Sequence, residues 1–463
     1  MTGTRRPNIL FLCTDQHRLD TLGCYGSPIC RTPALDALAN EGTRFDQTYT
    51  PTAICTPARA TLLTGLLPFR HALLANPERN VGYRTELDAH HIPFSTYLRD
   101  AGYRVGHVGK WHIGAEKGPE AFGFEGPHYP GWGNPYQHPD YLAYLDERGL
   151  PPHRLLSEVR GAFPNGRPAM VLAGVLDQPV EATFEYFLAE RAIARLRDYA
   201  RGFHDDGEPF FLACHWFGPH LPYVVPPAYY DLYDPANVTL PVSMAETFAG
   251  KPLVQRHYSA HWSFDRFTPD EWRTLIAAYW GYVTLIDEQV GRVLATVRDL
   301  GLWDDTAILF SADHGEFTGA HRLNDKGPAM YDDIYRIPLL LRMPGAASGR
   351  AEGRFVSWTD LTPTFLDLAG VPAPPAFDGC SLLPLARGEA VPDWRTEIVA
   401  EFHGHHFPYP QRMIRTERYK LVVNPSDRNE LYDLATDPHE LQNRYDHLEL
   451  TGVRRELMGR LYA

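Results

Sequence analysis

The sequence predicts an α/β protein in which helices cover both faces of a large, mostly parallel β-sheet, with a smaller antiparallel sheet near the C-terminus. Apolar runs of strand length alternate with amphipathic runs of helix length, which is the pattern of parallel strands joined by crossover helices. The chain has 463 residues, about three times the usual length of one domain, so it can bury a large core. Its 44% hydrophobic and 22% charged residues are typical of a folded enzyme and exclude a disordered chain.

The predicted strands of the large sheet are short apolar segments, at residues 8–14, 103–109, 210–214, 307–312 and 337–342. Helical patterns lie between them. Thr32 and Pro33 form the start of a short helix that ends before Gly42, since proline is favoured at the first helical position. Two longer helices are predicted over 181–202 and 269–300, and the second has a nearly continuous apolar stripe that should pack along the sheet.

Two parts of the chain interrupt this alternation. Residues 114–180 include a run rich in Gly, Pro and aromatic side chains at 127–139, and we interpret this part as an insertion or lid near the site. Later in the chain, a hairpin is predicted over 413–423 and a further strand over 430–434. We therefore predict a catalytic domain over residues 1–370 and a C-terminal subdomain over residues 371–463, which holds the small antiparallel sheet and a terminal helix.

Charge and cysteine content restrict the class of protein. The 44 Lys and Arg against 57 Asp and Glu give a net charge of −13, which argues against a nucleic-acid or membrane-surface partner but leaves room for a local cationic pocket. The six cysteines form no CxxC pair, and no apolar stretch approaches the about 20 residues that span a bilayer. The first apolar run lacks the features of a signal peptide. We predict a cytoplasmic protein and leave a homo-oligomer open.

Acidic side chains follow two distant strands of the predicted sheet. Asp15 comes directly after the strand at 8–14, and Asp313 and His314 follow the strand at 307–312. Ligands of parallel α/β sheets bind at the carboxyl ends of the strands, so these side chains could converge on one divalent cation. Oxygen ligands favour calcium, magnesium or manganese over a soft metal. A single such acid could equally cap a turn, but the repeated placement favours a metal.

Basic side chains follow other strands. Lys110 and His112 come after the strand at 103–109, His220 lies beyond the strand at 210–214, and Lys326 lies soon after Asp313. A lysine there could supply a point charge to an anionic substrate. Each histidine alone is more often an ordinary hydrogen-bonded residue than a catalyst.

The segment Cys55-Thr-Pro-Ala-Arg59 lies at the start of a predicted helix. The N-terminus of a helix favours anions and lowers the pKa of a thiol, so we expect a lowered pKa for Cys55. Arg59, one turn further on, should face the same side. The alternative is a buried structural cysteine.

Taken together, these motifs resemble the sulfatase branch of the alkaline-phosphatase-like superfamily. Cys55, Pro57 and Arg59 meet the family signature Cys-x-Pro-x-Arg, and further motifs at 109–112, 218–220, 313–315 and 430–438 follow in the family's order. The resemblance spans nearly the whole chain. Asp15-Gln16 and Asp313-His314 replace the commoner acid pairs, as in relatives that resemble choline sulfatases and phosphonate monoester hydrolases. Asn76 matches an active-site asparagine of that subgroup.

The resemblance implies a role for each of these residues. A formylglycine-generating enzyme would oxidise Cys55, and the hydrated aldehyde would supply the nucleophile that attacks sulfur. Calcium is expected as the metal, with manganese or magnesium as alternatives, held by Asp15, Cys55, Asp313 and His314. Arg59 would hold the hydrate, His220 would protonate the leaving alcohol, and His112 would take a proton to release sulfate. The implied substrate-binding residues are Lys110, Lys326, Asn76 and Gln16.

The predicted function is a sulfuric ester hydrolase that acts on a small-molecule or sugar sulfate. A phosphonate monoester hydrolase or phosphodiesterase with the same site is the alternative, although Lys110 and His112 favour sulfate. A non-catalytic protein that binds an anion or metal, and a metal-free thiol hydrolase, are further alternatives. Three segments rich in aromatic residues and histidine could rim the pocket and stack on an aryl or sugar ring, or could simply be packed loops: 127–141, 257–267 and 403–409.

Overall fold

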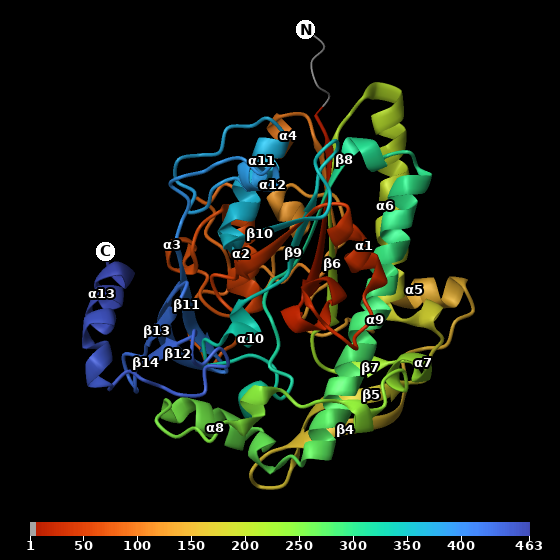
Figure 1. Cartoon of the computed structure of the whole chain (residues 1–463). Coiled ribbons are helices and arrows are strands. Elements are labelled where there is room, and N and C mark those ends of the chain that lie inside the picture. The colour runs from red at the N-terminus through yellow and green to blue at the C-terminus, as the bar shows by residue number, and fades with distance from the viewer. Residues whose placement is uncertain (1–5) are drawn as a thin grey trace.

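A seven-stranded sheet crosses the middle of the molecule in the order β10-β2-β9-β8-β1-β6-β3 (Figure 1). The structure is a computed structural model and describes residues 6–463. Strands β8, β1, β6 and β3 run parallel, whereas β9 is antiparallel to both of its neighbours. The strands span Asn8–Asp15 (β1), Thr43–Tyr49 (β2), Arg104–Gly109 (β3), Phe210–Pro219 (β6), Thr306–Ala312 (β8), Leu339–Arg342 (β9) and Arg350–Ser357 (β10).

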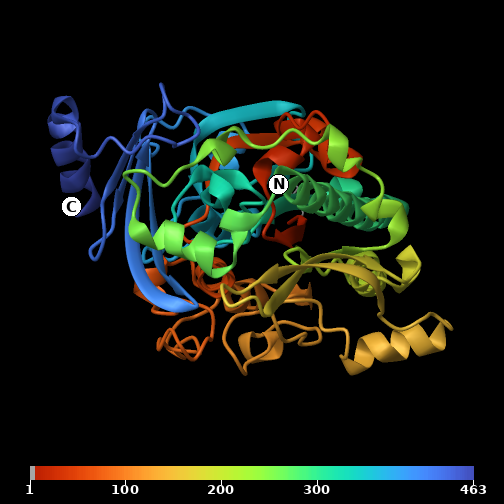
Figure 2. The ribbon, with the colours of Figure 1, turned by 90° about the horizontal axis from the view of Figure 1, so that it is seen from below.

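The fold class is confirmed, with two strands beyond the five predicted. The additional strands are β2 and β10, which pair with each other at one side of the sheet. The parallel centre is confirmed as well, because β1 pairs in register with β6 on one side and with β8 on the other. Their carboxyl ends therefore meet at one edge, which Figure 2 shows from below.

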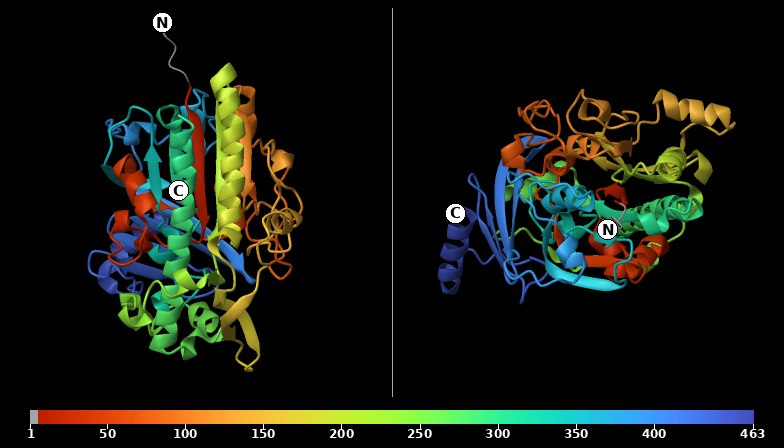
Figure 3. Two further views of the ribbon diagram at one scale, coloured as in Figure 1. Left: turned by 90° about the vertical axis from the view of Figure 1, so that its right-hand side faces the viewer. Right: turned by 90° about the horizontal axis from the view of Figure 1, so that it is seen from above.

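Helices cover both faces of this sheet. Alternate residues of β1 belong to separate cores, Leu10 and Leu12 to one and Ile9 and Phe11 to the other, as the two-residue period of a strand requires. The first core includes α1 (Pro33–Asn40), α6 (Phe184–Asp206) and α9 (Pro269–Asp299), and the last two run side by side (Figure 3). The second includes α2 (Cys55–Thr64), α4 (Phe94–Asp100), α11 (Leu361–Leu368) and α12 (Leu383–Ala386).

The C-terminal part of the chain forms an antiparallel sheet of β11 (Glu397–His405), β12 (Phe407–Thr416), β13 (Tyr419–Val423) and β14 (Glu430–Asp433). Helix α13 (Thr451–Leu461) packs its buried leucines on this sheet (Figure 2). The predicted small sheet and terminal helix are thus present, although β11 was not predicted. The boundary at residue 370 stays a prediction.

Residues 114–180 contain more regular structure than expected. The Gly- and Pro-rich run is irregular up to Pro139, where α5 (Pro139–Glu147) begins. Beyond it, β4 (Leu155–Ala162) and β5 (Pro168–Leu176) form a hairpin, and β7 (Tyr223–Val225) pairs with β5. The remaining helices are α3 (Pro68–His71), α7 (Pro227–Tyr230), α8 (Leu253–His261) and α10 (Asp332–Tyr335). Within residues 6–463, none of the helices combines the length and apolarity needed to span a bilayer.

Candidate active site

The predicted site residues meet because the strands that precede them are neighbours. Asp15 ends β1 and lies beside Pro219 at the end of β6, one residue before His220. Thr14 pairs with Ala312 of β8, so Asp313 follows on the same edge. Segments as far apart in the chain as Gln16 and Lys326, which are 310 residues apart, therefore supply one group of side chains.

Gly109 turns the end of β3 towards this cluster. Its φ is +103°, and a Cβ at this position would lie 1.8 Å from the carbonyl oxygen of His215, so only glycine fits. The next residue, Lys110, donates its backbone N–H to that carbonyl at 2.9 Å. Its side chain is fully buried, and Nζ lies 2.8 Å from Oδ2 of Asp15.

Arg59 joins the two acids of the site. Helix α2 begins at Cys55, and Arg59 lies one turn along it, on the side that was predicted. Its guanidinium donates to Oδ2 of Asp15 and to Oδ2 of Asp313, both at 2.9 Å. All three side chains are buried. Because a buried charge needs a partner, these ion pairs fix the orientation of both carboxylates.

The four side chains Asp15, Cys55, Asp313 and His314, next to Arg59, could hold a metal ion. Each of them places one ligand atom within 4.8 Å of the others, and all four are buried. The Nδ1–H of His314 donates to the Gly315 carbonyl at 2.9 Å, which leaves Nε2 free to face the cluster. Burial and the charge of Asp15 raise the pKa of Asp313, and a cation between the two acids would relieve this repulsion.

The expectation of a lowered pKa for Cys55 is wrong. Burial, and then the charge of Asp15, raise the pKa of this thiol to about 11, against the opposing charges of Lys110 and Lys326. Sγ lies 3.2 Å from Nε2 of His314 and 3.7 Å from Oδ1 of Asp15. An unmodified thiol with this pKa is protonated at neutral pH, which argues against the thiol-hydrolase alternative.

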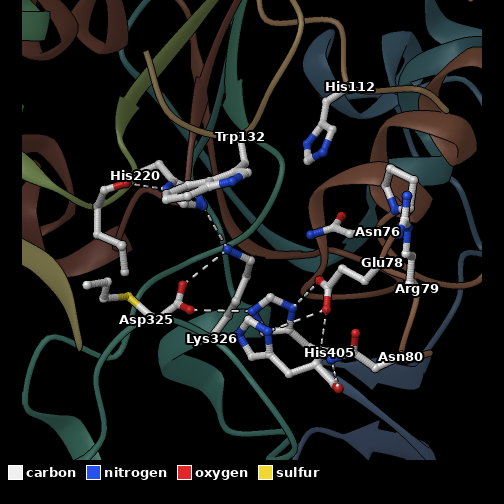
Figure 4. A pocket seen from close by; sticks show the side chains of 14 residues that line it. Asn76, Glu78, Arg79, Asn80, His112, Trp132, His220, Asp325, Lys326 and His405 are labelled. Atoms are coloured by element: carbon white, nitrogen blue, oxygen red, sulfur yellow. Dashed lines mark hydrogen bonds and ion pairs between the residues drawn. The ribbon is translucent and has the colours of Figure 1, made fainter. Parts of the chain in front are cut away.

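A pocket of about 450 Å³ is lined by side chains that include His112, His220 and Lys326 (Figure 4). Of the predicted catalytic and substrate-binding residues, His112, His220, Lys326 and Asn76 line it. The full lining comprises Asn76, Pro77, Glu78, Arg79, Asn80, His112, Trp132, Met170, His220, Leu221, Asp325, Lys326, His405 and His406. Cys55, Lys110 and Gln16 are not part of this lining, and all three are fully buried.

Lys326 is held by three neighbours. Its Nζ donates to Oε1 of Gln16 at 2.7 Å and to Oδ1 of Asp325 at 3.1 Å, and it lies 2.9 Å from Nε2 of His220. The amide nitrogen of Gln16 donates to Asp325 at 3.0 Å and also to Glu316. Gln16 therefore positions Lys326 in this structure.

The two candidate proton-transfer histidines are both neutral. His220 donates from Nδ1 to the Leu221 carbonyl at 2.6 Å, so Nε2 accepts from Lys326. Burial, Lys326 and Lys110 lower the pKa of His220. His112 points towards the pocket (Figure 4), and its Nδ1 has no hydrogen-bond partner. Burial and the charge of Lys110 lower its pKa too, so it can accept a proton.

Four non-glycine residues of the site have left-handed backbone: His112 (φ 51°), Asp325 (φ 66°) and His406 (φ 64°), which line the pocket, and Gln16 (φ 63°), which contacts Lys326. Each such conformation costs about 1–3 kcal/mol and persists where the surrounding structure enforces it. Strain of this kind is typical of sites that hold reactive groups in fixed positions.

The three segments predicted to rim the pocket differ in outcome. Trp132 comes from 127–141, and His405 and His406 come from 403–409. No residue of 257–267 lines the pocket; Tyr258 lies behind it and donates to the Lys326 carbonyl at 2.7 Å. The sequence reasoning missed residues 78–80, which lie in a loop, and it missed Asp325 even though this acid adjoins Lys326.

Asn76 connects the pocket wall to α2. Its Oδ1 accepts a hydrogen bond from the backbone N–H of Thr56 at 3.1 Å, next to the start of the helix at Cys55. Asn76 also lines the pocket, and its role as a substrate-binding residue stays a prediction.

Comparisons with known proteins agree over the whole chain. Residues 7–371 match the sulfatase family, and residues 319–463 match the family described as N-sulphoglucosamine sulphohydrolase, C-terminal. The chain is 27% identical to N-acetylglucosamine-6-O-sulfatase of Bacteroides thetaiotaomicron, covering 98% of this chain and 85% of the relative. It is 30% identical to choline-sulfatase of Rhizobium meliloti, covering 95% and 82%. The crystal structure of phosphonate monoester hydrolase of Agrobacterium radiobacter superposes with a TM-score of 0.81 at 27% identity, covering 99% and 95%.

Proposed function

Because the chain belongs to the sulfatase family and is a sulfuric ester hydrolase, we propose that it cleaves a sulfate monoester with a formylglycine made from Cys55. The observation that carries this proposal is that two groups of candidate catalytic residues lie next to each other. Asp15, Cys55, Asp313 and His314 lie together in the protein interior, and His112, His220 and Lys326 line the pocket next to them. The raised pKa of Cys55 supports it further, since an unmodified thiol there would be a poor nucleophile.

Asp15, Asp313, His314 and the side chain at position 55 would hold a divalent cation, for which we propose calcium. When bound, such an ion lowers the pKa of a hydroxyl group and offsets charge on the sulfuryl group. Arg59 and Lys110 contact the Oδ2 atoms of the two acids, which leaves Oδ1 of Asp15 to face Sγ of Cys55.

The chain's own residues supply the remaining chemistry. Arg59 would hold the aldehyde hydrate, and Lys110 and Lys326 would contact sulfate oxygens. A bound sulfate would offset the two lysine charges that lower the pKa of His220, so Nε2 could then hold the proton that the leaving alcohol needs. His112, neutral in the structure, would accept a proton from the second hydroxyl and release sulfate.

We infer a sugar sulfate as the substrate class. The pocket is larger than a sulfate ion needs, and its rim carries hydrogen-bonding groups of Asn76, Glu78, Asn80 and His405 suited to hydroxyls. Among the described lining residues, Trp132 is the only Phe, Tyr or Trp, whereas a quaternary ammonium favours an aromatic cage. The similarity to N-acetylglucosamine-6-O-sulfatase supports the same class. We also propose maturation by a formylglycine-generating enzyme and, given six free cysteines, a cytoplasmic location.

Replacing Asp313 with asparagine should lower the metal content of the purified protein. The change keeps the shape of the side chain but removes a charge from the ligand group. We expect a loss of about tenfold or more in metal affinity, measured by elemental analysis after dialysis against graded chelator. Asp325→Asn is the matched control, because this buried acid contacts Lys326 and Gln16 instead of the cluster. Unchanged metal retention in Asp313→Asn would argue against ligation.

The choice between sulfate and phosphonate can be measured directly. We expect kcat/KM for an aryl sulfate to exceed that for the matched aryl phosphonate monoester, because the resemblance to sulfatases includes the pair Lys110 and His112, which favours sulfate. The protein should be co-produced with a formylglycine-generating enzyme. If the protein prefers the phosphonate, the assignment of the site stands but the function is that of a phosphonate monoester hydrolase. The structural similarity to such an enzyme supports this alternative.

A further inference from the structure

A line of hydrogen bonds runs from the C-terminal sheet to the leaving-group side of the pocket (Figure 4). His405, the last residue of β11, lies between Glu78 and Asp325, and Asp325 in turn contacts Lys326. We infer that His405 is a positioning residue, which holds Asp325 and through it Lys326 in the geometry that sulfate-ester hydrolysis requires. This inference rests on the proposed function.

Both nitrogens of His405 face carboxylates. Nδ1 lies 2.9 Å from Oε1 of Glu78, and Nε2 lies 3.4 Å from Oδ2 of Asp325. A histidine can donate to two acceptors at once only as an imidazolium, and these two acceptors raise the pKa of His405 against the effect of burial. The side chain is 7% exposed, so water contributes little to holding either carboxylate.

The second carboxylate oxygen of Asp325 depends on His405 for a hydrogen-bond donor. Oδ1 accepts from Lys326 at 3.1 Å and from Gln16 at 3.0 Å, which leaves Oδ2 to His405. The backbone of Asp325 is in the left-handed region, so surrounding contacts must maintain its position. Removing His405 would leave a buried carboxylate oxygen without a donor and would allow the group to rotate, which would release Lys326 from its fixed partner.

The adjacent histidine offers a natural control. His406 contacts the other oxygen of Glu78, at 3.4 Å from its Nδ1, and it also lines the pocket. The described contacts of its ring include Glu78 and neighbouring aromatic rings but not Asp325. The two histidines thus both line the pocket and both contact Glu78, and they differ in the contact to Asp325.

The charged groups that face His405 are Glu78, Asp325 and, on the far side of Asp325, Lys326.

The experiment compares His405→Ala, His405→Gln and His406→Ala, each co-produced with a formylglycine-generating enzyme and checked for the aldehyde by peptide mass. Two substrates are used, 4-nitrophenyl sulfate, which is too small to fill the rim, and N-acetylglucosamine 6-sulfate. We expect His405→Ala to lower kcat about 10- to 100-fold on both, the scale of a misplaced catalytic group. His405→Gln should recover part of the loss, since its amide can still donate to Asp325. His406→Ala should lower the aryl sulfate rate less than His405→Ala does, because the described contacts of its ring do not include Asp325.

Binding of inorganic sulfate, measured by calorimetry, tests the same point without turnover. His405→Ala should weaken it about tenfold because Lys326 is displaced, and His406→Ala should weaken it less. An unchanged aryl sulfate rate in His405→Ala, with the loss confined to the sugar sulfate, would make His405 a substrate contact and overturn the positioning role. Equal losses in His405→Ala and His406→Ala would overturn it too. If the wild type hydrolyses no sulfate ester, the proposed function fails and the calorimetric comparison still decides the role of His405.

Discussion

Replacing Cys55 with alanine is expected to lower kcat at least about 10⁴-fold, the scale of losing a nucleophile, while leaving the fold nearly intact. Alanine cannot be converted to formylglycine, so the nucleophile is removed outright. The fold should survive because the change deletes one sulfur from a side chain at the start of α2, a small loss of buried volume. Steady-state kinetics on an aryl sulfate, with the thermal unfolding midpoint of each protein, would measure both effects.

Cys214→Ala provides the matched control for that experiment. Cys214 is another buried thiol, in β6, and burial alone raises its pKa. We expect this variant to keep nearly the wild-type kcat, with a similar small change in stability. A Cys55→Ala protein that retained most of its turnover would remove Cys55 from the mechanism.

The second large effect is expected for His220→Ala, and it should depend on the leaving group. A sugar alcohol needs a proton as it departs, so we expect a loss of about 10²- to 10⁴-fold in kcat/KM on a sugar sulfate. On 4-nitrophenyl sulfate, whose leaving group is stable as an anion, the loss should be small. A plot of log kcat/KM against leaving-group pKa for a series of aryl and alkyl sulfates should be steeper for the variant than for wild type.

His71→Ala controls for the removal of a buried histidine. His71 contacts Thr61 of α2 and the backbone of Leu73, and it does not line the pocket. We expect its activity to fall equally, if at all, on every substrate of the series. Equal losses across the series in His220→Ala would show that His220 acts on binding or structure instead of on proton transfer.

The core strands could be predicted because their apolar runs are continuous. β1 and β8 are buried along their full length, as parallel strands covered on both faces must be. Strand β2 could not be predicted, since the charged residues Arg44 and Asp46 interrupt its apolar pattern. They pair with each other on the partly exposed face of the strand. β4 is largely exposed, so its sequence lacks the apolar pattern on which such predictions depend.

The same reasoning explains which site residues were predicted. Asp15, Asp313 and His314 follow predicted strands, and this placement predicted that they converge, as they do in the structure. Glu78 and Asp325 lie in loops, where no periodicity marks a position. The pKa of Cys55 was predicted with the wrong sign because the sequence shows the helix start but not the burial, nor Asp15, whose Oδ1 lies 3.7 Å from the thiol.

The complete burial of Cys55 also bears on when this residue could be oxidised relative to folding. With an exposed fraction of 0% and a place at the start of α2, in contact with Asp15 and His314, the thiol cannot enter the catalytic centre of another enzyme while the protein is folded. If Cys55 is matured as proposed, its oxidation to the aldehyde would precede closure of the fold. Maturation and folding would then compete in time, and the active fraction of a preparation would record which of the two was faster.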